Sequence, residues 1–265
     1  MGGGSTLALM GILAYSLELY FDFSGYSDMA NGISNMINIP STKNFDSPYR
    51  ATSVSDFWKR WHISLTQFLT KYVYIPLGGN REGVVRTYIN IFIVFLVSGI
   101  WHGAAWTFII WGMLHGVIMI IERFLSKTVK LVKIPKVIGR IYSFVVVNIL
   151  WLIFNSNNML EVKRVLHEIV TMNFTLFPPE FESMFTTKTS NYFLSLIGIG
   201  SIAKYLPYFW VVIALIICQL PKNSDVIASS GEYAKNVWLA SGLAFLTFLS
   251  IISMSTASSF IYWSF

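Results

Sequence analysis

Long stretches of apolar residues with almost no charge among them constrain this chain more than any other feature. They lie at roughly 6–21, 87–100, 104–121, 140–154, 192–203, 206–220 and 237–262. A helix of about 20 residues crosses a bilayer. Lipid offers no partners to free backbone amides, so stretches of this kind must be helical. Several are short, which indicates tilted, broken or paired helices. The sequence predicts an all-α polytopic membrane protein with six or seven transmembrane helices.

The composition and the placement of charge agree with a membrane protein. Only 12% of the 265 residues are charged, about half the share found in water-soluble domains. The net charge of +6 comes from two basic loops, which contain Lys43, Arg50, Lys59, Arg60, Lys71, Arg81 and Arg86, and then Arg123, Lys127, Lys130, Lys133, Lys136 and Arg140. Loops rich in lysine and arginine face the cytoplasm. Since no basic face of a water-soluble domain is present, nucleic acid is not an expected partner.

The two basic loops bracket an apolar hairpin over residues 87–121, whose tip is Trp101-His102-Gly103. A helix from Arg86 to His102 would rise about 24 Å, against a hydrocarbon core of about 30 Å. His102 is therefore expected inside the membrane, toward the far leaflet. An ionisable side chain there is costly, which favours a general base or acid. The alternative is a histidine that only packs against a neighbouring helix.

A second histidine, His62, lies in the region 40–86, which we interpret as a cytoplasmic, re-entrant or amphipathic region. Residues 6–37 are predicted to form one long helix that precedes it. Ser55 and Asp56 suit the start of an amphipathic helix over 57–74, whose tryptophans would lie at the water–lipid boundary. In a functional role, His62 would orient a donor, relay a proton or stabilise an oxyanion. The alternative is a histidine at the membrane interface with no chemical role.

The remaining polar features predict less chemistry. His115 is expected to pack between helices, and His167 to lie on the surface of the polar stretch 155–190, which we assign to an extracytoplasmic loop. The scattered histidines show no zinc-binding spacing, so no metal site is expected. The single Cys218 excludes an intrachain disulfide. The turn at 75–81 contains Gly78-Gly79, which either cradles a phosphate through its amides or is an ordinary turn.

Several ordered motifs resemble those of one family. They are YFDFSGYSDMA at 20–30, NFDSPY at 44–49, FWKRWHISL at 57–65, YIPLGGNR at 74–81 and GIWHGAAW at 99–106. Together they resemble the membrane-bound O-acyltransferases (MBOAT), and within them the bacterial branch of the alginate O-acetyltransferase AlgI and its relative DltB. The chain resembles the C-terminal portion of an AlgI-like protein. The N-terminal helices of that branch are expected to be missing before Met1, and we expect the isolated chain to fold poorly or to be inactive.

The resemblance implies transfer of an acyl group, most simply acetyl, from a cytoplasmic thioester onto a hydroxyl of an exported cell-surface polysaccharide. His102 matches the catalytic histidine of the family, and His62 its second characteristic histidine. A thioester donor such as acetyl-CoA or an acyl carrier is a substrate, so no permanently bound cofactor is expected. Lys59, Arg60 and Arg81 would bind the phosphates of the donor. Membrane lipid, a polysaccharide acceptor and an extracytoplasmic acetyl-transferring protein are the expected partners, in a bacterial inner membrane.

Alternatives remain open at this point. The acceptor is alternatively teichoic acid, with D-alanine as the transferred group, or peptidoglycan. From other functional classes, a transporter would use His102 as a proton relay, although the expected internal repeat is absent from the sequence. A truncated, non-catalytic membrane protein is the third alternative.

Overall fold

A computed structural model describes residues 4–39, 41–128, 135–175 and 205–220, and scattered positions between 223 and 245. All secondary structure within these residues is helical. The elements are α1 (Gly4–Met36), η1 (Pro48–Arg50), α2 (Val54–Trp58), α3 (Ile63–Leu69), η2 (Thr70–Tyr74), α4 (Val84–His102), α5 (Trp106–Thr128), α6 (Lys136–Asn155), α7 (Met159–Val170) and α10 (Leu206–Cys218). The all-α prediction is confirmed.

Four of these helices, α1, α4, α5 and α6, are long and apolar enough to cross a membrane, and α10 is a shorter apolar helix. They correspond to the first four predicted spans and to the span at 206–220. The predicted span at 192–203 lies outside the described residues, and most of that at 237–262 does too. The chain is therefore a polytopic membrane protein, and the described part accounts for five of the seven apolar stretches.

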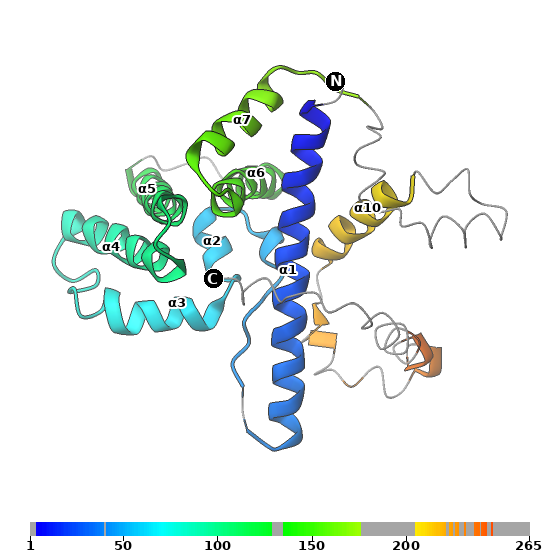
Figure 1. Ribbon diagram of the computed structural model, residues 1–265. Coiled ribbons are helices and arrows are strands. Elements are labelled where there is room, and N and C mark those ends of the chain that lie inside the picture. Colours follow the sequence, from blue (N-terminus) through cyan, green and yellow to red (C-terminus); the bar gives the residue numbers. More distant parts are fainter. Residues whose placement is uncertain are drawn as a thin grey trace.

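α1 runs almost the full height of the molecule (Figure 1). α4, α5 and α6 lie on one side of it and α10 on the other, while the C-terminal half of α1 projects beyond the neighbouring helices. A buried polar contact joins α1 to α6, because the Ser16 hydroxyl donates to Asn148 Oδ1 at 2.7 Å. The Tyr49 hydroxyl, from η1, donates to the Ser16 carbonyl oxygen at 2.7 Å. These bonds satisfy polar groups that lipid would leave unpaired.

The predicted amphipathic helix over 57–74 is wrong in its continuity and in its start. Residues 54–74 form three short helices, and the first break falls before His62. The backbone of His62 has φ 44° and ψ 55°, a left-handed conformation that ends a right-handed helix. The N-cap is Ser53 rather than Ser55, since the Ser53 hydroxyl accepts a hydrogen bond from the Asp56 amide.

The first aromatic side chains of this segment are more buried in the protein than the sequence predicted. The aromatic side chains of Phe57, Trp58 and Trp61 are 1%, 6% and 1% exposed, so they belong to the core rather than to the water–lipid boundary. Only the later aromatics, Phe68 and Tyr72, are more than half exposed. Burial of three large rings outweighs their interfacial preference, since each contributes a few kcal/mol to folding. The segment therefore lies inside the helical assembly.

The stretch at 155–190, which the sequence predicts to be an extracytoplasmic loop, contains a helix. Its first part is the amphipathic helix α7, which starts at the Asn158 cap and packs on the N-terminal half of α1 (Figure 1). The Asn158 side chain accepts from the Glu161 amide, which is a standard N-cap. The mixed charges of this stretch favoured a polar loop in the sequence analysis. In the structure, helical spacing turns Val162 toward the interior. Residues 176–190 lie outside the described residues.

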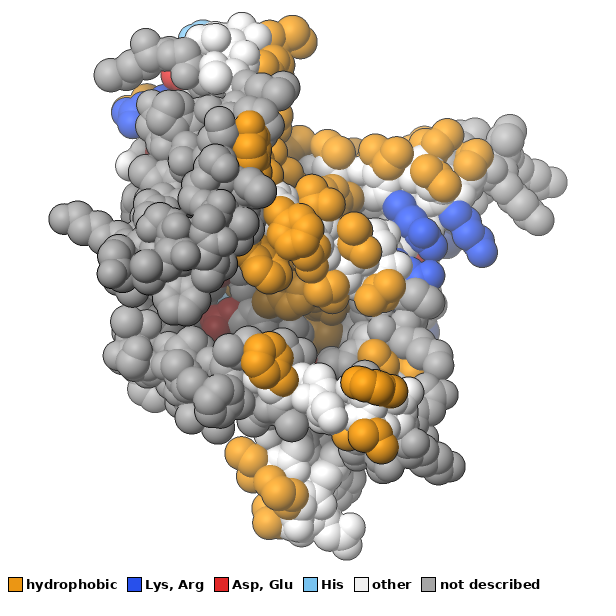
Figure 2. Space-filling model, turned by 90° about the vertical axis from the view of Figure 1, so that its right-hand side faces the viewer, with side chains coloured by type: hydrophobic (Ala, Val, Ile, Leu, Met, Phe, Trp, Pro, Cys, Tyr) orange, Lys and Arg blue, Asp and Glu red, His pale blue; other side chains and the backbone are white. Residues whose placement is uncertain are grey.

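Apolar side chains cover much of the described surface on one face of the molecule, while lysine and arginine side chains gather toward one side of it (Figure 2). Exposed side chains on the long helices include Val85, Ile121, Ile141 and Ile149. In a water-soluble protein so large an apolar surface would be a binding site or an aggregation hazard. On membrane-spanning helices it is the surface that lipid covers.

Candidate active site around two histidines

The predicted hairpin is present, and its two helices approach closely at glycines. α4 and α5 are joined by three residues, Gly103 to Ala105. A Cβ on Gly99 would lie 2.5 Å from the Phe108 carbonyl oxygen, and one on Gly112 would clash with the Phe95 carbonyl oxygen. Small residues at such positions let transmembrane helices meet backbone to backbone. Gly99 and Gly112 thus let α4 and α5 meet, and the hairpin fixes the position of its last α4 residue.

That last residue is His102. Its side chain is 7% exposed. The imidazole is surrounded by aromatic rings from α5 and α6, with ring centroids 5.3 Å from Trp111 and 5.0 Å from Phe154, both edge to face. Trp101 lies 4.8 Å away on the same helix. The ring is therefore held in one place by shape, among groups that exclude water, as a base that must act on a bound substrate requires.

His62 lies at the start of α3 and approaches the same region from another element. Its imidazole packs edge to face on Phe23 of α1 at 4.8 Å and lies 6.5 Å from Trp101. Trp101 is therefore a neighbour of both His62 and His102. The structure brings together the two histidines that the sequence singled out, although 40 residues separate them. A left-handed backbone at His62 and a helix end at His102 aim them at a shared aromatic surface.

The protonation of His62 follows from its surroundings. Burial lowers the pKa of His62 from its ordinary 6.5 to about 4, so the ring is neutral at pH 7. The Ser64 hydroxyl donates its one proton to Asn44 Oδ1 at 2.6 Å. Ser64 Oγ also lies 3.4 Å from His62 Nδ1, a contact whose donor and acceptor depend on the tautomer of the ring.

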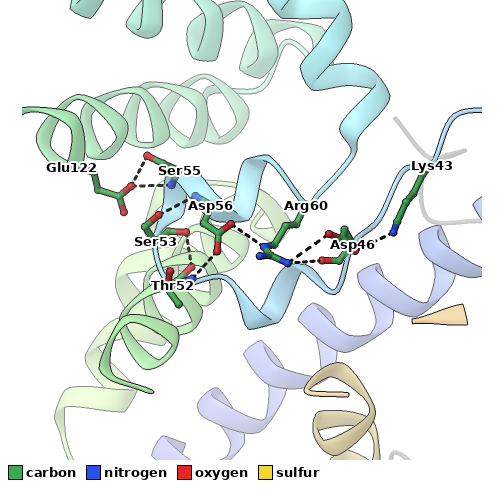
Figure 3. A network of polar contacts seen from close by, with 9 residues as sticks. Lys43, Asp46, Thr52, Ser53, Ser55, Asp56, Arg60 and Glu122 are labelled. Carbon is green, nitrogen blue, oxygen red and sulfur yellow. Dashed lines mark hydrogen bonds and ion pairs between the residues drawn. The ribbon is translucent and has the colours of Figure 1, made fainter. Parts of the chain in front are cut away.

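The three predicted cationic residues lie in different surroundings. Arg60 is engaged within the fold, because its Nε is 2.8 Å from Asp56 Oδ1 and its guanidinium is 3.6 Å from Asp46 Oδ2 (Figure 3). Lys59 is exposed and lines a cavity. Arg81 is exposed at the turn after η2 and is not among the residues lining that cavity. The structure thus brings only one of them, Lys59, to the cavity wall.

The Gly78-Gly79 turn is an ordinary turn rather than a phosphate cradle. Both glycines have positive φ, at 98° and 59°, which explains the residue type. The amides of Gly78, Gly79 and Arg81 each donate to a backbone carbonyl oxygen nearby. The buried Asn90 side chain of α4 donates to the carbonyl oxygens of Leu77 and Gly79. The turn's amides are therefore occupied, and α4 holds the turn in place.

The cavity measures about 1070 Å³ and lies between α2, α3, α4, α5 and α6. Its wall is mostly apolar, with charged side chains from Lys59, Glu122 and Arg123. On α4 the lining extends to Ser98, which is one helical turn before His102 on the same face. Trp58 also lines it and contacts Trp111, whose ring contacts His102. The cavity thus ends one helical turn from His102, which is not among the residues that line it, and its volume suits a large ligand.

The other two histidines agree with the sequence analysis. His115 is fully buried, packs on Trp111 at 4.8 Å, and accepts a hydrogen bond at Nδ1 from Trp58 Nε1 at 3.1 Å. His167 is exposed on α7. No group of three or more histidine, cysteine or acidic side chains suited to a metal ion is found among the described residues.

Sequence reasoning missed the carboxylates that hold the His62 segment. Asp46 and Asp56 pair with Arg60, and Glu122 of α5 binds the start of α2 (Figure 3). One signal was available, because Glu122 follows His115 and Met119 at helical spacing and ends an apolar span. An acidic residue at that place needs a partner. Its partner Ser55, 67 residues away, could not be predicted from the sequence.

Comparison with known proteins accounts for this arrangement. Residues 6–162 match the sequence profile of the membrane-bound O-acyltransferase family. The chain is 38% identical to a peptidoglycan O-acetyltransferase of Helicobacter pylori over 97% of its length and 49% of that protein. It is 47% identical to a probable alginate O-acetylase AlgI of Azotobacter vinelandii, over 57% of this chain and 30% of the relative. It is 36% identical to a teichoic acid D-alanyltransferase of Bacillus subtilis, over 45% of this chain and 32% of the relative.

The chain therefore spans about half the length of the first of these relatives and about a third of the others. The family match includes α1, the His62 segment, the α4–α5 hairpin and α6, which are the elements that build the site. This chain is a member of the membrane-bound O-acyltransferase family.

Proposed function

We propose that this protein transfers an acyl group, most simply acetyl, from a cytoplasmic thioester to a hydroxyl group of a cell-envelope polysaccharide, with His102 as general base. The observation that carries the proposal is the position of His102. It is a buried imidazole at the end of α4, next to Trp101, which also contacts His62, and one turn beyond the last α4 residue of a large cavity. Two relatives of this chain are named as O-acetyl-transferring enzymes, which supports the same chemistry.

The reaction follows from general base catalysis. A neutral His102 imidazole takes the proton of the acceptor hydroxyl as that oxygen attacks the thioester carbonyl carbon. The tetrahedral intermediate collapses by breaking the carbon–sulfur bond, and the imidazolium returns the proton to the leaving thiolate. The products are an ester and a free thiol. His62, neutral at pH 7, serves as a second proton relay or donates its one ring N–H to the developing oxyanion.

The cavity is the proposed donor site. Its volume of about 1070 Å³ and apolar wall suit the acyl and pantetheine part of a thioester. The wall also carries Lys59 and Arg123, whose charges suit phosphate groups. Arg81 is proposed for the same role from outside the cavity. Arg60 is already paired with Asp46 and Asp56, so the proposal for donor phosphates rests on the other cations.

The surroundings of the reaction follow from the charge pattern. The basic loops favour a cytoplasmic side for the start of α4 and the end of α5, in a bacterial inner membrane. His102 then lies toward the opposite leaflet, where an exported glycan is accessible. We propose that a separate extracytoplasmic protein completes transfer to the polymer.

One alternative acceptor is favoured by a specific observation. The match to the peptidoglycan O-acetyltransferase covers 97% of this chain, whereas the match to the alginate O-acetylase stops at 57%. The C-terminal region therefore aligns with a protein named for peptidoglycan. Transfer of D-alanine to teichoic acid has the weaker match at 36% identity over 45% of the chain.

The test uses a host that lacks its own acetylases of this family but retains the export pathway. The unaltered chain, His102→Ala and a matched His167→Ala control are expressed at equal membrane levels. O-acetyl esters are then quantified separately on exported polysaccharide and on peptidoglycan. Although the length of the chain predicts an inactive protein, the described residues contain the whole candidate site, so we expect acetylation with the unaltered chain and the control and a loss of more than about 1000-fold with His102→Ala. Equal acetylation by His102→Ala, or none by the unaltered chain, would contradict the proposal.

A further inference from the structure

Three side chains of α5 lie in a row against the segment that carries His62. His115, Met119 and Glu122 occupy positions i, i+4 and i+7, which a helix brings to one face. Trp58 Nε1 donates to His115 Nδ1 at 3.1 Å, and the Ser55 hydroxyl lies 3.2 Å from Met119 Sδ. We call these three α5 residues the tether face.

Glu122 makes the strongest of these contacts. Its Oε1 accepts from the Val54 amide at 2.7 Å, and its Oε2 accepts from the Ser55 amide at 2.8 Å and from the Ser55 hydroxyl at 2.6 Å (Figure 3). The first amides of a helix have no partner inside the helix. A carboxylate that accepts three hydrogen bonds is held by charge-assisted bonds, about twice as strong as neutral ones. The start of α2 is thereby fixed to α5.

The fixed end of α2 is connected rigidly to His62. Arg60 pairs with Asp56 inside the segment and with Asp46 of the loop that precedes it. Figure 3 shows these contacts as one line. The Ile63 amide donates to the Asn44 carbonyl oxygen at 3.1 Å, directly after His62. A displacement of α2 therefore moves His62.

The tether face lies on α5, which is part of the hairpin that carries His102. α5 meets α4 backbone to backbone at Gly99 and Gly112, so α4 and α5 move as one body. Trp111 of α5 contacts His102 at 5.3 Å. The tether face is thus a polar connection, within the described residues, between the His62 segment and the body that holds His102.

We propose that the tether face fixes the position of His62 relative to His102. This makes Glu122 and His115 positioning residues for acyl transfer. This inference rests on the proposed function. Neither residue contacts the reacting atoms, so their removal lowers the turnover number by misplacing His62 relative to His102. A misplacement of about 1 Å costs on the order of 100-fold in rate.

The kinetic test compares Glu122→Gln, Ser55→Ala and the double variant with Glu161→Gln. Glu161 is a matched control, because it also binds the amide at the start of a helix, α7, but contacts neither histidine segment. Gln keeps the size of the side chain, so the cavity wall is preserved. We expect kcat to fall about 10- to 100-fold in Glu122→Gln with a much smaller change in KM for the donor. The double variant should lose little more than Glu122→Gln.

A second readout needs no activity. In a Cys218→Ser background, Ala51→Cys places a thiol at a site that is 1% exposed, three residues before α2. We expect maleimide to label it about tenfold faster when Glu122→Gln is added, since labelling tracks local opening. Glu161→Gln should leave the rate unchanged.

These outcomes separate the two proposals. If His102→Ala retains transfer, the proposed function fails while the labelling still tests the tether. Unchanged labelling in Glu122→Gln overturns the tether. Faster labelling with unchanged kcat, a loss confined to KM, or an equal loss in Glu161→Gln overturns the positioning role.

Discussion

His62 is a single residue whose surroundings make a measurable prediction about pH. Its pKa is about 4 in the folded protein, because burial disfavours the charged ring, against 6.5 when exposed. Below pH 6.5 the unfolded chain binds a proton at His62 that the folded chain does not. Stability from this residue is therefore complete above pH 6.5 and declines as the pH falls toward 4, by about 3 kcal/mol in total.

Thermal unfolding in detergent between pH 4 and pH 7.5 measures this effect, with His62→Phe as the comparison. The unaltered protein should lose stability with falling pH more steeply than the variant, by up to about 1.4 kcal/mol per pH unit. Identical slopes for the two proteins would show that His62 is not buried in the neutral form.

Candidate residues could be predicted where the residue type is costly in its surroundings. A histidine within an apolar hairpin indicated His102, and the structure buries this ring against Trp111 and Phe154, while its catalytic role stays a prediction. Asp56 has the i,i+4 spacing to Arg60 that a helix brings together, so that partner was available from the sequence. The contact of Arg60 with Asp46 and those of Glu122 with Val54 and Ser55 could not be predicted, because these residues are distant in sequence.

At the scale of elements, the α4–α5 hairpin depends on glycines. A Cβ on Gly112 would clash with the Phe95 carbonyl oxygen, and backbone cannot rotate away as a side chain can. Gly112→Ala should therefore separate α4 from α5 and cost about 1–3 kcal/mol, with a loss of acyl transfer.

Gly25→Ala on α1 is the matched control, because a Cβ there meets nothing within 4 Å. The same change should be neutral or stabilise the helix by about 0.5–1 kcal/mol. Thermal unfolding and elution as a single species in detergent compare the two variants. Equal stability of Gly112→Ala and Gly25→Ala would contradict close packing of the hairpin.

Elements were predictable to different degrees for a physical reason. α1 and the hairpin follow from the need to satisfy backbone groups in lipid, which local sequence alone decides. The helix predicted over 57–74 failed, because aromatic residues at helical spacing are equally compatible with an interfacial helix and with a broken segment in the core. Burial of Phe57, Trp58 and Trp61 decided between them.

At the scale of the whole molecule, the basic loops predict the orientation in the membrane. Glu82, before α4, and Ala104, at the hairpin tip, are both exposed and lie at opposite ends of α4. In a Cys218→Ser background, Glu82→Cys should react with a membrane-impermeant maleimide only after cells are permeabilised.

Ala104→Cys should not share that cytoplasmic access, and its labelling should not increase on permeabilisation. A gel shift of the labelled chain measures both sites, and a cytoplasmic thiol of known location serves as the standard. Labelling of Glu82→Cys in intact cells would reverse the topology and place His102 toward the inner leaflet.

The class of protein, the long helices and the hairpin could all be predicted from the amino-acid sequence, which also singled out the two histidines. These predictions follow from the desolvation of backbone and charge, which acts locally on each stretch of the chain. Only the folded molecule shows that His62 and His102 share Trp101, that a cavity reaches Ser98, and that Glu122 holds α2. Each of those depends on contacts between segments far apart in the chain, whose geometry is set by packing and not by the order of residues.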